Sequence, residues 1–419
     1  MMELKKYNAN HTKVLKINQI VRTVSETHRF DKDKLIAINT SDVENGVMGS
    51  GTLTSVDELK GQFKKAIVKD DILFSEIRPT NRRFAKVTTE DTKDYVVSTK
   101  LMVLRKYNED VDLEYFYYCL TNQPFLDILQ RRAENRIGSF PQITFDLLSE
   151  YAFPIPPISE QKRISSVIST LDKKIALNRQ INQNLEAMAK QLYDYWFVQF
   201  DFPNEEGKPY KSSGGEMVWN EKLKRNIPVG WHCGNLFEIA VFTNGLACQK
   251  FRPKDDEVPL PVIKIREMHD GISVDTEEVT SNIPESVKVY NGDVLFSWSA
   301  SLEVMLWAYG LGGLNQHIFK VTSANDFPKS FYYFQLLDYV DVFKKMAEAR
   351  KTTMGHITQD HLQQSTIAIP DNKDIADKFE ELISPIFKQI VKLQEEISNF
   401  IKQRDELLPL LMNGQITIE

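Results

Sequence analysis

The sequence predicts an α+β fold in which two similar α/β bodies form a pseudo-twofold repeat and two long antiparallel helices join them as a coiled coil. Three observations lead to it. Short motifs recur in the same order in both halves, a proline-containing junction introduces a long helical segment in each half, and short β-type runs precede each junction. A chain of 419 residues, 42% of them apolar, is long enough for two or three domains with packed cores.

The repeat consists of four motifs. "DILFSEIR" from Asp71 matches "DVLFSWSA" from Asp293, "YFYYCL" matches "FYYFQL", and "PQIT" matches "GHIT". The junctions "FPIPPISEQKRI" and "IAIPDNKDIADKF" come last. The offsets run from 293 − 71 = 222 residues for the first motif to 369 − 155 = 214 residues for the junction. Four motifs in register indicate a duplicated body rather than chance similarity.

The segment before each junction predicts a mixed α/β body. Runs such as "AIVKDDILFSEI", "YVVSTKLMVL" and "QHIFKV" are typical of short strands, and "DLEYFYYCLTNQPFLDILQRRA" and "PKSFYYFQLLDYVDVFKKMAEAR" are typical of helices. The stretch between the repeats is rich in Gly, Pro and charge, which indicates a linker. We therefore expect bodies at residues 1–157 and 231–371, helices at 158–200 and 372–419, and a linker at 201–230.

The segments after the junctions predict two helices of about 40 residues, or about 60 Å each. Ser159 is the expected N-cap of the first helix. Apolar residues follow a 4-3 spacing in both segments, and Asn178 and Asn182 continue the first stripe as polar residues that would fix the register of a helix pair. One body cannot bury so long a stripe, so we expect the two helices to pair antiparallel. The alternative is two unrelated helices that pack locally.

The sequence contains no catalytic motif that we recognise. It lacks the P-loop, the Asn/Asp-Pro-Pro-Tyr/Phe tetrapeptide of amino-methyltransferases, His-Glu-x-x-His, and the carboxylate–lysine pattern of nucleases. The three cysteines are too scattered for a disulfide framework or a zinc site, and the seven histidines show no ligand spacing. No apolar run reaches about 18 residues, and no signal peptide is evident. We expect a cytoplasmic protein with no membrane contact, no catalytic residue, no metal and no cofactor of its own.

Basic residues cluster just before the "PQIT" and "GHIT" loops in both halves. The net charge of −6 disfavours a protein that coats polyanions indiscriminately, but local basic patches can still bind DNA. The planar fork of arginine suits guanine edges and phosphates, and Gln, Asn and Ser complement it. For any single arginine, the alternative is a helix end at which the dipole favours a basic residue.

The chain resembles the specificity subunits of type I restriction-modification systems. The resemblance covers nearly the whole chain, and the motifs that carry it are "DILFSEIR", "IGSFPQIT", "FPIPPISEQKRISSVISTLDKKIALNRQINQNLEAMAKQLYDYWF", "IPVGW", "LNQHIFKV" and "LLPLLMNGQI". It implies two target-recognition domains, each reading one half of a split double-stranded DNA sequence, and helices that set the unread spacer. It also implies that the helices dock two modification subunits, which carry S-adenosylmethionine, and that two ATP-dependent restriction subunits can join.

The two halves differ most where reading is expected. "SEIRPTNRR" carries arginines, whereas "SWSASLEVMLWAYG" carries tryptophans and few charges, so two different readers imply an asymmetric target. The rival functions are an adaptor that binds only protein, and a fused DNA methyltransferase or nuclease. The candidate DNA-contacting residues are Ser75, Arg78, Arg82, Arg83, Arg136, Ser139 and Gln142 in the first body, and Lys264, Arg266, Ser297, Trp298, Ser299, Thr353 and His356 in the second.

Overall fold

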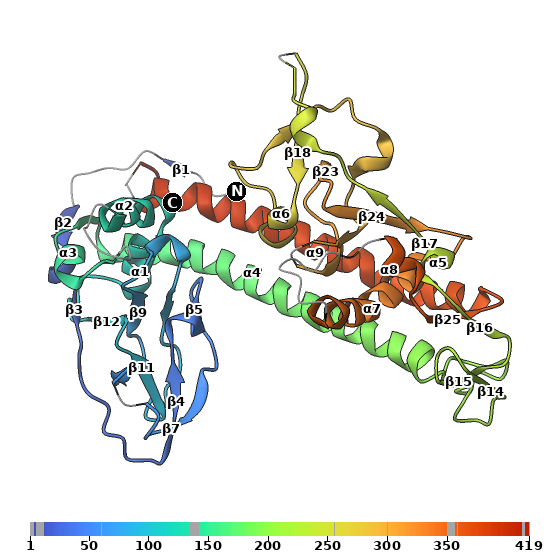
Figure 1. Ribbon diagram of the computed structural model, residues 1–419. Coiled ribbons are helices and arrows are strands. Elements are labelled where there is room, and N and C mark those ends of the chain that lie inside the picture. Colours follow the sequence, from blue (N-terminus) through green and yellow to red (C-terminus); the bar gives the residue numbers. More distant parts are fainter. Residues whose placement is uncertain are drawn as a thin grey trace. The chain divides into compact units, whose positions relative to one another are not determined.

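The computed structural model describes residues 4–5, 12–59, 61–134, 142–254, 256–299, 301–349, 357, 359–412 and 415–418. The chain folds into two compact units. Unit 1 comprises Met1–Lys174 and Phe400–Glu419, and unit 2 comprises Ile175–Asn399 (Figure 1). Two long helices contribute residues to both units, and each unit is described by itself below.

Unit 1 is built on two four-stranded sheets. The first has the order β10–β9–β12–β3 with antiparallel neighbours, and the second has the order β7–β4–β11–β8 with β4 and β11 parallel. The strands are β1 (Leu4–Lys5), β2 (Lys13–Lys16), β3 (Val21–Thr23), β4 (Lys34–Ile38), β5 (Val43–Glu44), β6 (Val47–Met48), β7 (Thr52–Ser55), β8 (Phe63–Lys65), β9 (Ile72–Ser75), β10 (Phe84–Lys86), β11 (Tyr95–Ser98), β12 (Leu101–Lys106), β13 (Ala152–Ile155) and β26 (Thr417–Ile418). The short helices are α1 (Leu113–Thr121), α2 (Gln123–Glu134) and α3 (Phe145–Ser149).

Unit 2 also has two four-stranded sheets. Their orders are β17–β24–β21–β22, all antiparallel, and β19–β18–β23–β20 with β18 and β23 parallel. The strands are β14 (Met217–Asn220), β15 (Arg225–Pro228), β16 (Trp231–Gly234), β17 (Ala240–Asn244), β18 (Leu260–Ile263), β19 (Glu278–Val279), β20 (Lys288–Val289), β21 (Val294–Ser297), β22 (Glu303–Leu306), β23 (Gly312–Leu314), β24 (Ile318–Ser323) and β25 (Ile367–Pro370). The short helices are α5 (Leu236–Ile239), α6 (Ile265–Asp270) and α8 (Gln359–Gln363), and α7 (Lys329–Ala349) is a longer helix of 21 residues.

The two units repeat one topology, so the predicted α+β repeat is confirmed. When the first sheet of unit 2 is read from its other edge, its order β22–β21–β24–β17 corresponds to β10–β9–β12–β3 of unit 1. The second sheet, β19–β18–β23–β20, corresponds directly to β7–β4–β11–β8. In both units the parallel pair lies at the centre of the second sheet. The junction strands β13 and β25 also have equivalent partners, since each pairs antiparallel with a strand from the start of its body, β2 or β16.

The acidic residue at the start of the repeated motif has a structural role. The carboxylates of Asp71 and Asp293 each accept a hydrogen bond of 2.8 Å from the backbone N–H three positions earlier, which closes the turn into β9 or β21. Each also pairs at 2.8 Å with a basic residue of the adjacent strand, Arg105 in unit 1 and Lys320 in unit 2. The acidic residue therefore fixes the entry of the strand whose far end leads into the candidate recognition loop.

The isoleucine of "PQIT" and "GHIT" ties the second loop to the first. The backbone N–H of Ile143 donates to the carbonyl of Glu76 at 2.7 Å, and that of Ile357 donates to the carbonyl of Trp298 at 3.0 Å. Both isoleucine side chains are buried. The same bond thus holds each loop to the residue that follows the repeated serine.

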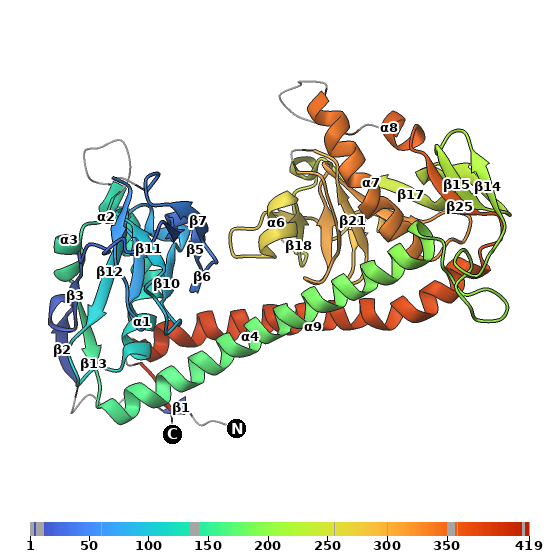
Figure 2. The same ribbon diagram turned by 90° about the horizontal axis from the view of Figure 1, so that it is seen from below.

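The two long helices are α4 (Ile158–Tyr193) and α9 (Asp374–Met412), of 36 and 39 residues. Within unit 2, Asn178 donates to Glu396 at 3.0 Å and Asn182 donates to the carbonyl of Ile390 at 3.3 Å, so residue numbers rise along one helix and fall along the other (Figure 2). Both asparagines are buried. The expected antiparallel pair is confirmed, and it excludes two helices that pack separately.

The ends of α4 differ slightly from the sequence prediction. The helix begins at Ile158, because the N–H groups of Glu160 and Gln161 both donate to the carbonyl of Pro157. Ser159 therefore lies in the first turn and is not the N-cap. At the other end, a π-helical turn over Asp194–Val198 follows α4.

Residues 201–230, predicted as a linker, hold the hairpin of β14 and β15. Phe202 and Ile227 from this segment are buried in the core of unit 2. The domain boundaries drawn from the sequence stay predictions. Among the described residues, no helix has the length and apolar character needed to cross a membrane.

Candidate nucleic-acid interface

In unit 1 the candidate surface is the loop that follows β9. Arg78 and Arg82 have positive φ angles of 46° and 54° and flank a 3₁₀ turn over Pro79–Asn81. Non-glycine residues rarely adopt this left-handed conformation, and such strain concentrates at functional sites. Arg78 is exposed, and no described residue pairs with its guanidinium. It is therefore available to an external anion or base.

The other arginines of this loop are held by the protein. Arg82 donates to Asn45 at 2.8 Å and to Gln123 at 2.7 Å, and its guanidinium lies over the ring of Phe84. Burial, followed by the charge of Arg404, lowers the pKa of Arg82. Arg83 pairs with Glu44 at 3.2 Å. Both side chains are half-buried, so they shape the loop more than they extend from it.

The repeated serines are buried. Ser75 is 3% exposed, and its hydroxyl bonds the N–H and the carbonyl of Ile77 at 3.1 and 3.2 Å. Ser297 is 0% exposed and donates to the carbonyl of Ser301. Their hydroxyls close the turns after β9 and β21, and burial leaves them little access to DNA.

Gln142 belongs to the same surface as the arginine loop. It forms an isolated bridge with Ile77, and its Nε2 donates to the carboxylate of Glu76 at 2.8 Å. The remaining candidates of the two paired loops, Arg136, Ser139, Thr353 and His356, lie outside the described residues.

In unit 2 three candidates line one cleft of about 450 Å³. Lys264 and Arg266 flank the start of α6, and Ser299 follows β21. Both cations are already paired: Lys264 contacts Glu277 at 2.6 Å, and Arg266 contacts the buried Glu267 at 2.7 Å. The cleft is therefore less basic than the sequence suggested.

Polar residues that the sequence analysis did not select complete this cleft. The loop before β24 supplies Asn315, Gln316 and His317, and the turn before β18 supplies Cys248 and Gln249. The sequence held one signal for them, since "NQH" stands directly before the apolar strand run "IFKV" and so at the end of a buried strand. Trp298 contacts the cleft through His317, with ring centroids 5.6 Å apart. Carboxamides and imidazole offer the mixed donors and acceptors that base edges require.

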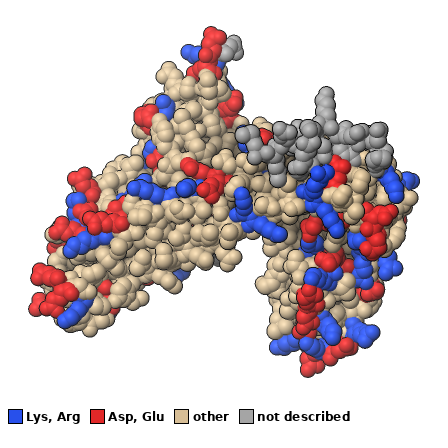
Figure 3. Space-filling model, turned by 180° about the vertical axis from the view of Figure 1, so that it is seen from behind, with Lys and Arg blue, Asp and Glu red and all other residues tan. Residues whose placement is uncertain are grey.

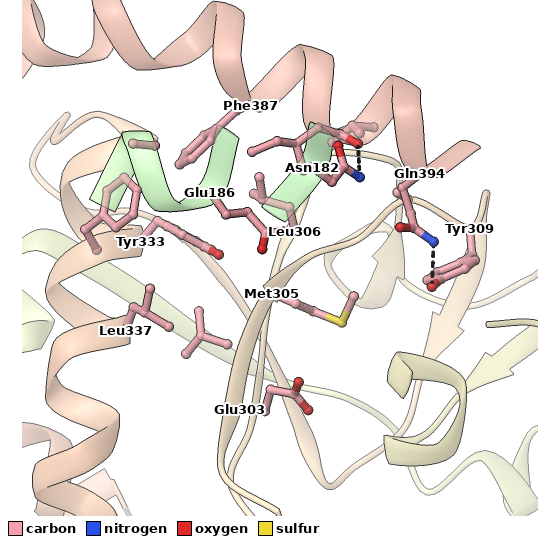
Figure 4. Close-up of a pocket in the computed structure, with 16 residues that line it drawn as sticks. Asn182, Glu186, Glu303, Met305, Leu306, Tyr309, Tyr333, Leu337, Phe387 and Gln394 are labelled. Atoms are coloured by element: carbon pink, nitrogen blue, oxygen red, sulfur yellow. Dashed lines mark hydrogen bonds between the residues drawn. The ribbon is translucent and has the colours of Figure 1, made fainter. Parts of the chain in front are cut away.

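A second cavity of about 350 Å³ lies between the long helices, α7 and β22 of unit 2 (Figure 4). Its walls include Leu306, Leu337 and Phe387, and Gln394 donates to the hydroxyl of Tyr309 across it at 3.0 Å. Most of the lining is apolar. In the part of the chain that the structure describes, no three His, Cys, Asp or Glu residues are grouped to hold a metal ion. This cavity marks imperfect packing of the helix pair against the body.

The face drawn in Figure 3 carries charges of both signs. On the side drawn in Figure 3, lysine and arginine lie interspersed with aspartate and glutamate. This face therefore gains little from nonspecific attraction to phosphates.

Comparisons with known proteins agree along nearly the whole chain. A family model described as "Type I restriction modification DNA specificity domain" matches residues 13–187 and 228–405. The chain is 28% identical over 458 residues to the type I restriction enzyme HindI specificity subunit of Haemophilus influenzae, which covers 96% of this chain and 98% of that protein. It is 25% identical over 315 residues to the MjaIX specificity subunit of Methanocaldococcus jannaschii, covering 73% and 69%. The crystal structure of a type I restriction-modification S subunit from M. genitalium shares the fold, with a TM-score of 0.57, 15% identity and coverage of 97% and 98%.

Proposed function

The chain belongs to the type I restriction modification DNA specificity domain family, and from this premise we propose how it reads its target. It is the non-catalytic, DNA-recognising specificity subunit of a type I restriction-modification system. Each unit reads one half of a split, asymmetric sequence. One observation carries this proposal: the two units repeat the same strand order, yet the loops after the equivalent strands β9 and β21 differ in chemistry. A shared scaffold with different loops suits two readers of different bases.

The side chains proposed to contact DNA follow from exposure. In unit 1 Arg78 is the leading candidate, and Arg82, Arg83 and Gln142 support the loop around it. Arg136, Ser139, Thr353 and His356 stay proposals for the paired loops. In unit 2 we assign the role to the cleft that Lys264, Arg266 and Ser299 line, with Trp298 behind it. Ser75, Ser297 and Ser299 keep a supporting role because they are buried.

The partners proposed for the complex match the internal repeat. We infer that each of the two repeated units binds one modification subunit through its part of α4 and α9, which gives two modification subunits. S-adenosylmethionine would be bound by those subunits, because no methyltransferase motif occurs in this chain. Two ATP-dependent restriction subunits would join the modification complex. We place the assembly in the cytoplasm, with the DNA on which it acts.

The test exchanges one reader and follows the methylated sequence. The chain is combined with its modification subunits, and the methylated motif is determined by sequencing; then residues 1–152 are replaced by the matching part of a relative. We expect one half of the motif to change while the other half and the spacer stay. A simultaneous change in both halves would refute the two-reader model. The chain alone should not methylate or cut DNA, and turnover by the purified chain would overturn the non-catalytic assignment.

A further inference from the structure

The cleft of unit 2 presents an ordered carboxamide at its inner edge. Gln316 is half-buried there, and its backbone N–H donates to the carbonyl of Leu246 at 2.8 Å. Its side-chain Nε2 lies 3.3 Å from Nε2 of His317. Because a carboxamide nitrogen can only donate, His317 accepts this bond. The bond orients the amide of Gln316 with its nitrogen toward His317.

The position of His317 is set in turn by its neighbours. Its ring packs against that of Trp298 with centroids 5.6 Å apart, and its backbone N–H donates to Oδ1 of Asn315 at 3.3 Å. Since Nε2 accepts from Gln316, the ring hydrogen must lie on Nδ1. That atom is buried and has no hydrogen-bond partner among the described residues. A buried polar atom left unpaired in this way is uncommon in folded proteins.

The groups left over on Gln316 match one base. One N–H of its Nε2 is used by His317, so a second N–H and the Oε1 acceptor remain, and no described residue bonds that oxygen. Adenine presents an N7 acceptor and an N6 donor in the major groove, which a glutamine can bond with both groups at once. Guanine presents two acceptors there and would face the carbonyl oxygen of the amide with O6. Two cations in the cleft would ordinarily favour guanine. Glu277 and Glu267 pair with Lys264 and Arg266, however, so this preference is weakened.

We propose that Gln316 reads an adenine in the half-site recognised by unit 2, and that His317, held by Trp298, is the positioning residue that orients its amide. The inference rests on the proposed function, because it assumes that unit 2 reads DNA. It assigns the two halves of the target different chemistry, with a free guanidinium in unit 1 and an oriented carboxamide in unit 2.

The test compares base preference in the assembled complex. The full chain with its modification subunits is used to select binding sites from random DNA, first as the native protein and then as Gln316→Ala. We expect the native protein to require A at one position of the second half-site, and the variant to lose that preference by about tenfold or more while the first half-site is unchanged. Gln363→Ala, an exposed glutamine on α8, is the matched control and should change nothing.

A single-atom change in the DNA separates reading from folding. Replacing that adenine with 7-deazaadenine removes the N7 acceptor, and it should weaken native binding but have no further effect on Gln316→Ala. His317→Phe keeps a ring against Trp298 but removes the acceptor, so it should reduce the preference for A without lowering the melting temperature. An unchanged second half-site in Gln316→Ala would overturn this inference alone. If the native complex selected no split sequence, the proposed function itself would fail.

Discussion

At the scale of single residues, the repeated motifs divide into side chains that hold the backbone and side chains that remain available. The polar groups of Asp71 and Ser75 form hydrogen bonds within turns and between strands, and both side chains are nearly inaccessible to solvent. Arg78, three positions beyond Ser75, is exposed and unpaired among the described residues. Similarity between the two halves therefore reports mostly the scaffold, and the reading residues must be sought where the halves differ.

The most specific motif at the first junction contains a glutamine with such a holding role. Gln161 is 0% exposed, accepts from the N–H of Asp112 at 2.7 Å and donates to the carbonyls of Asp110 and Pro156 at 2.9 and 2.8 Å. Two of these bonds join the start of α4 to the segment before α1, and the third holds the junction at Pro156. They give partners to backbone groups of Asp110 and Asp112 and to the carbonyl of Pro156, a buried residue.

We predict that Gln161→Ala lowers the free energy of unfolding of unit 1 by about 2–3 kcal/mol, because it removes a buried side chain and three hydrogen bonds, one of them to the buried Pro156. The effect is measured by urea denaturation of the full chain, with far-UV circular dichroism as the signal. Gln191→Ala, at an exposed site on the same helix, is the control and should stay within about 0.5 kcal/mol of the native protein. Equal stability of the two variants would show that the Gln161 amide does not hold the junction.

At the scale of elements, a histidine beside the junction strand β25 of unit 2 forms ion pairs with two acidic residues. His232 on β16 lies with Nδ1 2.5 Å from Asp371, which follows β25, and with Nε2 3.2 Å from Glu238 on α5. Burial lowers the pKa of His232, but the hydrogen bonds to Asp371 and Glu238 outweigh it, and the net shift is upward. The histidine is half-exposed, so solvent screens part of the interaction.

We predict that the contribution of His232 to stability depends on pH. A pKa raised in the folded state means that the stabilisation is fully present below the unfolded value of about 6.5 and is lost as pH rises through the folded pKa. The difference in melting temperature between the native protein and His232→Gln should thus be larger near about pH 6, where the histidine is charged, than near about pH 9, where it is neutral. A difference in melting temperature that is the same at both pH values would show that the charge of His232 does not stabilise the folded state.

The helix pair contains two buried asparagines with different surroundings. The Nδ2 of Asn178 bonds the carboxylate of Glu396, whereas Asn182 has an Oδ1 that is buried without a hydrogen-bond partner among the described residues. Asn182 also lines the cavity of Figure 4, so a slightly different side chain can be accommodated. Polar residues at such positions specify register at some cost in stability.

We predict opposite effects for the same substitution at the two sites. Asn182→Leu should raise the free energy of unfolding by about 1 kcal/mol, because removing the unsatisfied oxygen and adding apolar contact outweigh the loss of the 3.3 Å hydrogen bond to the carbonyl of Ile390. Asn178→Leu, the matched comparison, should lower it, because the carboxylate of Glu396 loses its partner. Thermal unfolding of both variants decides between them, and a loss of stability in Asn182→Leu would contradict the reasoning.

At the scale of the whole molecule, sequence predicted the repeat and the helix pair but not the composition of the recognition surfaces. The order of motifs and the 4-3 spacing of apolar residues are local patterns in the sequence, so they predict the duplication and the helix pair without knowledge of the fold. The surroundings of a loop side chain are not: Arg82 is held by Asn45 and Gln123, which lie 37 and 41 residues away. For the same reason Gln316 was not selected, since only the folded unit brings it beside Lys264 and Arg266.

The last prediction concerns the helices as a ruler for the unread spacer. The insertion points are the boundaries of the two units, between residues 174 and 175 in α4 and between residues 399 and 400 in α9. One heptad in both helices keeps the stripes in phase and lengthens the pair by about 10 Å. At 3.4 Å per base pair this corresponds to about three base pairs, and it also rotates one half-site by roughly 100° about the DNA axis.

Binding selection from random DNA should then return the same two half-sites with a spacer about three base pairs longer, and with weaker binding because of the rotation. The heptad in α4 alone is the control: its added residues have no partners on α9, so it should lower thermal stability instead of lengthening the spacer. Retention of the native spacer at full affinity by the double insertion would show that the helices do not set the distance. The two outcomes differ because length along a paired helix is transmitted only when both partners gain it, whereas an unpaired turn is absorbed locally as a bulge.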